Sequence, residues 1–118
     1  MKPTHNISGI IITFNEEKRI KSCIGSLKKV ADEVIVVDSY SKDNTKALCK
    51  NLDVTFIENE WMGFSKTKNF ANSIAKHEFV FSLDADEVLS DELIKNINKL
   101  KKRGLESGKI YAFNRLNN

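Results

Sequence analysis

The sequence predicts an α/β fold in which a mainly parallel sheet lies between two layers of helices, as an alternating β/α three-layer sandwich. Short runs of apolar and often β-branched residues, too short for helices, occur at residues 10–12, 34–37 and 79–83. Segments with the spacing of amphipathic helices separate these runs. Because parallel strands need crossover connections, this alternation favours a parallel sheet with helices on both faces.

The expected elements follow one another in a regular order. Strands are expected at residues 7–14, 34–37, 54–57 and 79–83, with a fifth at 109–113. The helices between them are predicted from apolar positions spaced like one face of a helix. These positions are Ile20, Cys23, Ile24 and Leu27, then Ala47 and Leu48, then Phe70, Ala71, Ile74 and Ala75 between residues 65 and 75, and finally Leu93, Ile94, Ile97 and Leu100.

Polar residues mark the ends of two of these helices. Residues 43–45 (Asp-Asn-Thr) are expected to cap the second helix. Ser90 is the expected N-cap of the fourth helix, with Asp91 and Glu92 in its first turn. We expect this helix to end at Gly104.

Length and composition fit a single domain over residues 1–118. With 41% hydrophobic and 30% charged residues, the chain can bury one core. The start is polar, and no apolar run approaches the roughly 20 residues that cross a bilayer, so we expect a cytoplasmic protein. Cys23 and Cys49 match no metal-ligand spacing and are expected to be reduced, buried thiols.

The net charge of +3 comes mainly from lysines on predicted helical faces. The densest basic run, Lys99 with residues 101–103, lies at the expected end of the fourth helix, where cations suit the helix dipole. A nucleic-acid or anionic-membrane patch is the alternative. Since no aromatic residues interleave with these charges, we expect no nucleic-acid partner.

Polar clusters follow three of the predicted strands. They are residues 13–17 (Thr-Phe-Asn-Glu-Glu), 38–41 (Asp-Ser-Tyr-Ser) and 84–87 (Asp-Ala-Asp-Glu). Ligands of open parallel sheets bind outside the carboxyl ends of the strands, so three clusters on one rim favour a binding site. Taken alone, the first two also fit ordinary turns, and Asn15 or Thr13 could cap the first helix.

The third cluster carries the clearest chemistry. Three carboxylates in four residues repel one another unless a positive charge compensates them. Mg²⁺ or Mn²⁺ would do so, because such hard cations are held by one or two carboxylates together with substrate phosphates and water. Lys68 is a candidate second cation for the same phosphates. An exposed acidic turn and a solvated lysine are the alternatives.

Four segments in this order resemble family 2 glycosyltransferases of the Rossmann-like, nucleotide-diphospho-sugar transferase (GT-A) type. They are residues 11–16 (Ile-Ile-Thr-Phe-Asn-Glu), residues 36–45 with the pattern D-S-x-S-x-D-x-T, residues 61–64 (Trp-Met-Gly-Phe) with Lys68-Asn69, and residues 82–87 with L-D-A-D-E. The likeness covers nearly the whole chain. It looks closest to the lipopolysaccharide-core β-glucosyltransferase branch.

The resemblance implies a nucleotide-sugar site and roles for its residues. Thr13, Phe14, Asn15 and Glu16 would line the nucleotide pocket, with Asp38 and Ser39 near the base and ribose. Lys68 would face the diphosphate. Asp84, Ala85 and Asp86 would contact the nucleotide sugar, with Asp84 near the ribose or sugar and with Asp86 and Asp84 as metal ligands. Many relatives carry a second Asp where this chain has Ser39. We expect Trp61 and Phe64 to anchor their loop on the domain, with a sugar-facing loop as the alternative.

The implied reaction is metal-dependent, inverting transfer of a sugar from a nucleotide diphosphate, by expectation a UDP-hexose, to a saccharide or lipid-linked saccharide. Such enzymes build cell-surface polysaccharide or lipopolysaccharide, with possible association to the inner face of the membrane. No residue matches the general base, which is expected beyond Asn118, so the chain is expected to be the N-terminal part of a longer enzyme. A non-catalytic nucleotide-sugar-binding module is the alternative. A nucleotidyltransferase is disfavoured, since no Gly-rich phosphate loop follows the first strand.

Overall fold

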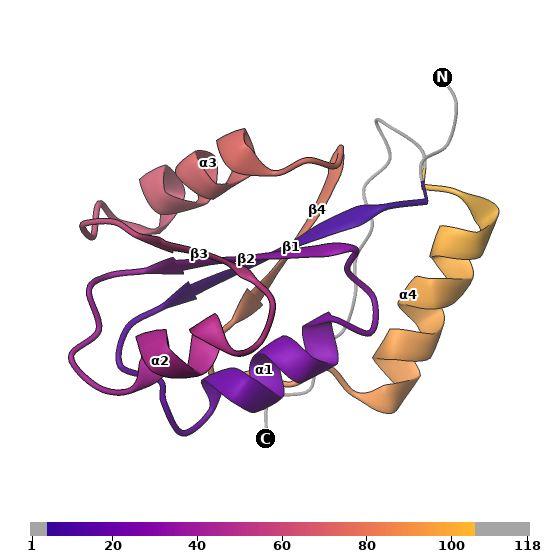
Figure 1. The fold of residues 1–118 in the computed structure, drawn as a ribbon. Coiled ribbons are helices and arrows are strands. Elements are labelled where there is room, and N and C mark those ends of the chain that lie inside the picture. The colour runs from indigo at the N-terminus through magenta and orange to yellow at the C-terminus, as the bar shows by residue number, and fades with distance from the viewer. Residues whose placement is uncertain (1–4, 106–118) are drawn as a thin grey trace.

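The computed structural model describes residues 5–105, in which strands and helices alternate as predicted (Figure 1). The elements are β1 (Ile7–Thr13), α1 (Ile20–Leu27), β2 (Glu33–Asp38), α2 (Thr45–Lys50), β3 (Thr55–Glu58), α3 (Phe64–Ile74), β4 (Phe79–Asp84) and α4 (Asp91–Arg103). Their bounds agree with the expected ones to within one or two residues at most ends. The fifth strand expected at 109–113 lies outside the described residues.

The four strands form one parallel sheet in the order β3-β2-β1-β4. β1 lies between β2 and β4, with Thr13 opposite Asp38 on one side and Ile12 opposite Asp84 on the other. The carboxyl ends of these three strands therefore meet at one edge of the sheet. That edge carries all three polar clusters predicted from the sequence.

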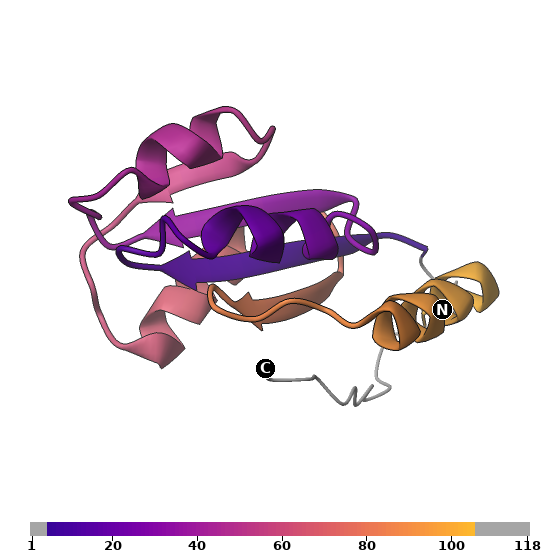
Figure 2. The same ribbon diagram turned by 90° about the horizontal axis from the view of Figure 1, so that it is seen from below.

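Both faces of the sheet are covered, with α1 and α2 on one face and α3 on the other (Figures 1 and 2). The larger core cluster includes Ile11, Ile20, Leu27, Val36 and Ile97, and the smaller one is built from Ile10, Ile35, Val37 and Ala71. Neighbouring residues of β1 thus serve opposite faces, which explains why the strand reads as a continuous apolar run. The predicted three-layer arrangement is confirmed.

Gly9 lets α1 approach β1 closely. A Cβ atom at this position would lie 2.7 Å from Cδ2 of Leu27 and 3.1 Å from Cβ of Ala31, well inside ordinary contact distances. Any larger residue would push the end of α1 away from the sheet. The contact therefore fixes α1 relative to β1, and with it the loop that joins them.

The fourth helix begins and ends as predicted. Ser90 Oγ accepts a hydrogen bond from the N–H of Leu93 at 3.1 Å, Asp91 and Glu92 lie in the first turn, and Gly104 follows the last residue with a φ of 88°. Lys101 near the end of the helix donates to the carbonyl of Val30 and to the carboxylate of Asp32. This part of the basic run is therefore structural.

The start of the first helix differs from expectation, and that of the second agrees with it in part. α1 begins at Ile20 with Arg19 as N-cap and no side-chain capping bond, so the alternative that Asn15 or Thr13 caps it is wrong. At α2 the N-cap Asn44 makes no such bond, whereas Asp43 accepts the N–H of Thr45 at 3.0 Å. None of the helices within residues 5–105 is long and apolar enough to cross a membrane.

Candidate functional site

The acidic turn after β4 presents two of its three carboxylates outward. The N–H of Glu87 donates to the carbonyl of Asp84 at 2.9 Å, and the N–H of Asp84 donates to Oε1 of Glu87 at 3.2 Å, so the turn closes on itself. Ala85 and Glu87 are buried, while Asp84 and Asp86 are exposed. Glu87 thus maintains the turn and leaves Asp84 and Asp86 accessible.

Helix α1 holds this turn and the segment after it at three points. Nη1 of Arg19, the N-cap residue, lies 3.8 Å from Oδ2 of Asp86. Cys23 Sγ donates to the carbonyl of Asp84 at 3.3 Å. Ser26 Oγ accepts the N–H of Leu89 at 3.0 Å. Positions 19, 23 and 26 are spaced four and three residues apart, which places them on one side of the helix. One face of α1 therefore positions the acidic turn.

The donor atoms at the turn fit a divalent cation that also binds phosphate. Among residues 5–105 no group of three His, Cys, Asp or Glu side chains is arranged to hold a metal ion. Two exposed carboxylates are nonetheless the protein share expected of a Mg²⁺ site, where phosphate and water oxygens complete the coordination. Asp84 and Asp86 therefore suit a cation that arrives with a diphosphate.

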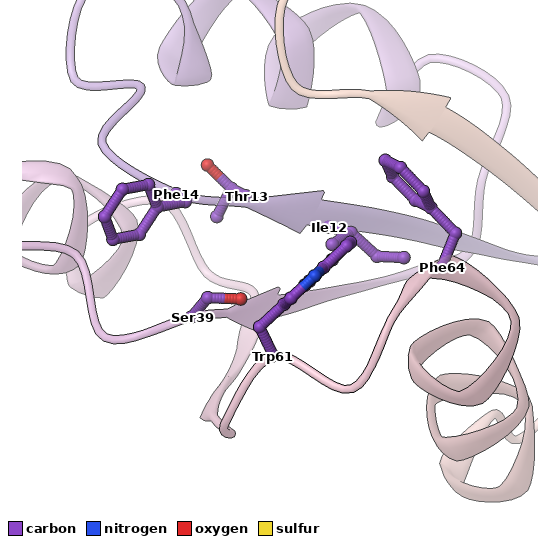
Figure 3. Close-up of a pocket in the computed structure, with 6 residues that line it drawn as sticks. All are labelled: Ile12, Thr13, Phe14, Ser39, Trp61 and Phe64. Carbon is purple, nitrogen blue, oxygen red and sulfur yellow. The ribbon is translucent and has the colours of Figure 1, made fainter.

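An aromatic pocket lies beside this turn, at the ends of β1 and β2. It has a volume of about 470 Å³ and is lined by Ile12, Thr13, Phe14, Ser39, Trp61 and Phe64 (Figure 3). The rings of Trp61 and Phe64 meet edge to face with centroids 4.9 Å apart. Figure 3 shows Trp61 on the segment that leads into α3 and Phe64 at the start of that helix. The pocket can therefore receive a flat, partly apolar group.

The aromatic walls are not buried anchors. Phe14, Trp61 and Phe64 are 53%, 52% and 63% exposed, so the expectation that Trp61 and Phe64 anchor their loop on the domain is wrong. They belong to neither core cluster. Thr13, by contrast, is buried, and its Oγ1 has no hydrogen-bond partner among the described residues, so a bound ligand could satisfy it.

Lys68 links the aromatic pocket to the acidic turn. A small hollow of about 20 Å³ is lined by Lys68 of α3, by Asp84 and by Phe64, which also lines the aromatic pocket. Lys68 is exposed there. The structure thus brings the predicted cation to the same hollow as the first carboxylate of the D-x-D turn.

Of the six residues expected around the base and ribose, three do not line the aromatic pocket. Asp38 is fully buried, and both its carboxylate oxygens accept hydrogen bonds from Ser41. Its neighbour Ser39 lines the pocket. Asn15 and Glu16 line a separate polar hollow of about 350 Å³ together with Arg19. The cluster after β1 is therefore divided between two hollows, with Thr13 and Phe14 in the first.

The two cysteines are reduced and buried, as predicted. Burial, and then the negative charges of Glu87 and Asp84, raise the pKa of the Cys23 thiol to about 12, and burial raises the pKa of Cys49 to about 11. As the pH rises, the thiols of the unfolded chain ionise before those of the folded protein. Their contribution to the free energy of unfolding is therefore fully present below about pH 9 and is lost as the pH rises toward 12.

We expect both thiols to resist alkylation by iodoacetamide at pH 8 in the folded protein, reacting more than about 100-fold more slowly than in urea. The thiolate is the reactive form, and raised pKa values together with burial suppress it. Mass spectrometry of timed samples measures the rates. Rapid labelling of Cys23 under native conditions would contradict its contact with Asp84.

The model of the family described as glycosyl transferase family 2 matches residues 8–116. The chain belongs to glycosyl transferase family 2. An uncharacterized glycosyltransferase of Rickettsia bellii is 46% identical over 90 residues, which cover 76% of this chain and 31% of that protein. The lipopolysaccharide core biosynthesis glycosyltransferase LpsC of Rhizobium meliloti is 36% identical over 98 residues, covering 79% of this chain and 36% of LpsC. The family 2 chain therefore spans about a third of the length of these relatives.

Solved family 2 structures share the fold. TarS 1-349 of S. aureus, crystallised in complex with UDP, superimposes with a TM-score of 0.64 at 28% identity, covering 83% of this chain and 32% of that one. A second structure is glucosyl-3-phosphoglycerate synthase of Mycobacterium tuberculosis, crystallised with Mn²⁺, UDP and glucosyl-3-phosphoglycerate. It superimposes with a TM-score of 0.62 at 23% identity, covering 70% of this chain and 34% of that one. The second likeness shows the fold alone. The predicted GT-A fold is confirmed.

Sequence reasoning missed several residues that shape this site. No pattern in the sequence singles out Arg19, and Cys23 is predicted only as part of the apolar stripe of the first helix, although positions 19 and 23 lie four residues apart on one side of a helix. Ser41 and Thr45 were read as local turn residues. Their partners lie in the loop after β1, so no local pattern in the sequence indicates those contacts.

Proposed function

We propose that the enzyme containing this chain transfers a hexose from UDP to a saccharide or lipid-linked saccharide, with inversion, during synthesis of lipopolysaccharide or another cell-surface polysaccharide. This chain would be its N-terminal, donor-binding domain. The continuous surface from the aromatic pocket through Lys68 to Asp84 carries the proposal. The UDP complex of TarS supports the donor, and the similarity to LpsC supports the pathway.

In this proposal the uracil base lies in the aromatic pocket, where Phe14 and Trp61 provide stacking surfaces. Thr13 and Ser39 supply the polar groups beside it. The diphosphate then extends toward Lys68, whose ammonium group offsets part of its charge. The order of these residues along the surface matches the order of base and diphosphate in the donor.

Asp84 and Asp86 would hold Mg²⁺ or Mn²⁺, which when bound supplies positive charge that stabilises the departing nucleotide diphosphate. The buried members of the turn, Ala85 and Glu87, keep both carboxylates directed outward. Arg19 would exchange its contact with Asp86 for the phosphates. We assign no residue of 5–105 as the general base, because Asp84 and Asp86, the exposed carboxylates of the turn, would already bind the metal ion of the donor.

A donor-binding module without transfer activity is the second candidate function. It is favoured because no general base is assigned among residues 5–105.

Trp61 gives a direct test, because it is the only tryptophan of the chain. We expect UDP to change its fluorescence in the presence of Mn²⁺. Replacing Trp61 with Ala should weaken UDP binding about 10-fold in calorimetric titrations, since stacking of a base on an aromatic ring contributes roughly 1–3 kcal/mol. Binding of inorganic pyrophosphate, which has no base, should not change.

Val88→Ala serves as the matched control, because Val88 is also exposed but does not line the pocket. Its UDP affinity should equal that of the unmodified protein. If Trp61→Ala weakens UDP and pyrophosphate equally, the base does not bind in the aromatic pocket. If the unmodified protein binds no UDP, the proposed donor is wrong.

A further inference from the structure

We propose that Ser41 and Thr45 are positioning residues, which hold the loop of residues 14–19 between β1 and α1 in the shape that binds the donor. Ser41 and Thr45 would thus act on the donor through this loop, which we call the braced loop, and not through contacts of their own. The inference rests on the proposed function and names the residues that maintain its site.

Ser41 connects a buried carboxylate to the braced loop. Its Oγ donates to Oδ1 of Asp38 at 2.5 Å and accepts the N–H of Asn15 at 2.7 Å, while its own N–H donates to Oδ2 of Asp38 at 2.8 Å. A hydroxyl has one proton, so its donation to Asp38 leaves a lone pair directed to Asn15. Ser41 therefore fixes the backbone of the loop at Asn15 relative to Asp38 in the sheet.

Thr45 repeats this arrangement one step further along the loop. Its Oγ1 donates to Oδ1 of Asp43 at 2.6 Å and accepts the N–H of Glu16 at 3.0 Å. The other oxygen of Asp43 accepts the N–H of Glu17 at 3.2 Å. Three successive backbone N–H groups of the braced loop therefore end on side chains of segment 38–45.

The charge on Asp43 supports these bonds. Burial alone would raise the pKa of Asp43, but hydrogen bonds from Thr45 and from the N–H of Glu17 outweigh it and hold the pKa below its usual value. The carboxylate therefore stays ionised at neutral pH. An ionised acceptor strengthens each hydrogen bond that it receives.

The braced loop has a conformation that needs support. Asn15 has a φ of 52°, in the left-handed region that residues other than glycine adopt at a cost in free energy. Its side chain returns a bond to the other segment, since Oδ1 accepts the N–H of Lys42 at 2.7 Å. Without the brace, Asn15 can relax toward more ordinary backbone angles.

A direct role in donor binding does not suit these side chains. Asp38 and Thr45 have no exposed surface, and the hydroxyl of Ser41 already serves a donor and an acceptor. The braced loop, in contrast, begins with Phe14 in the aromatic pocket and ends with Arg19 at Asp86. A shift of this loop therefore changes both ends of the proposed site.

The test compares variants that lose a hydroxyl with variants that keep it. We expect Ser41→Ala and Thr45→Val to weaken UDP binding about 10-fold and to speed amide hydrogen exchange at residues 15–17. Ser41→Thr and Thr45→Ser should restore most of both properties. Ser73→Ala, which removes a hydroxyl bonded to the carbonyl of Phe70 on α3, should change neither.

The brace is refuted if Ser41→Ala and Thr45→Val lower stability toward urea but leave UDP affinity and the exchange of residues 15–17 unchanged. Should Thr45→Val fail to fold because Thr45 is fully buried, Ser41→Ala at a half-buried position still decides the question. If the unmodified protein binds no UDP, the proposed function fails. Exchange at residues 15–17 then still shows whether the brace holds the loop.

Discussion

Replacing Asp86 with Ala is expected to weaken Mn²⁺-dependent binding of UDP by about 100-fold or more. Even residues that only support metal ligands alter metal affinity about 10- to 100-fold, and Asp86 is one of just two exposed carboxylates of its turn. The turn itself should survive, because backbone atoms of Asp84 and the side chains of Glu87 and Cys23 close it. Calorimetric titration with UDP, with and without Mn²⁺, measures the effect.

The fold should tolerate this substitution. Arg19 and Asp86 form an exposed pair at 3.8 Å, and such pairs contribute about 0–1 kcal/mol to stability. Asp91→Ala is the matched control, since it also removes an exposed carboxylate but lies on α4. A variant at Asp86 that binds UDP as tightly as this control, and with the same dependence on Mn²⁺, would exclude the turn as the metal site.

Replacing Ile11 with Ala is expected to lower the free energy of unfolding by about 2–5 kcal/mol. Ile11 has no exposed surface and lies in β1, between β2 and β4, within the cluster that packs against α1. The truncated side chain leaves a cavity that neighbouring strands cannot fill without losing their register. Urea denaturation followed by circular dichroism measures the change.

Val88→Ala again provides the comparison, because it also shortens an aliphatic side chain but at an exposed position. Its stability should differ from that of the unmodified protein by less than about 0.5 kcal/mol. If Ile11→Ala is equally mild, β1 does not form the centre of the core. The folded Ile11→Ala protein should still bind UDP, since Ile11 does not line the pocket.

The layers of the fold could be predicted because burial on both faces leaves a direct record in the sequence. The isoleucines of β1 form a continuous apolar run, and the stripe of α4 carries its own N-cap at Ser90. The start of α1 was harder to predict. Four loop residues with no regular pattern separate Asn15 from Ile20, so a plausible capping side chain lies too far from the helix.

The acidic turn was predictable from its charge density, but the shape of the site around it was not. Trp61 and Phe64 look like core residues in the sequence, and only their placement beside Phe14 makes them walls of a pocket. The brace depends on hydrogen bonds between two loops that are separated by α1 and β2. Such contacts follow from the topology of the sheet and leave no periodic signal.

The walls of the aromatic pocket differ in how freely they can vary. Phe14 begins a loop whose backbone is bonded to segment 38–45. Trp61 lies in the connection before α3 and Phe64 is the first residue of that helix, and neither packs in either core cluster. Mutagenesis at positions 61 and 64 can therefore reshape the pocket without disturbing the sheet. If the pocket binds the base of the donor as proposed, a library confined to these two positions is the direct route to a protein that accepts a different nucleotide.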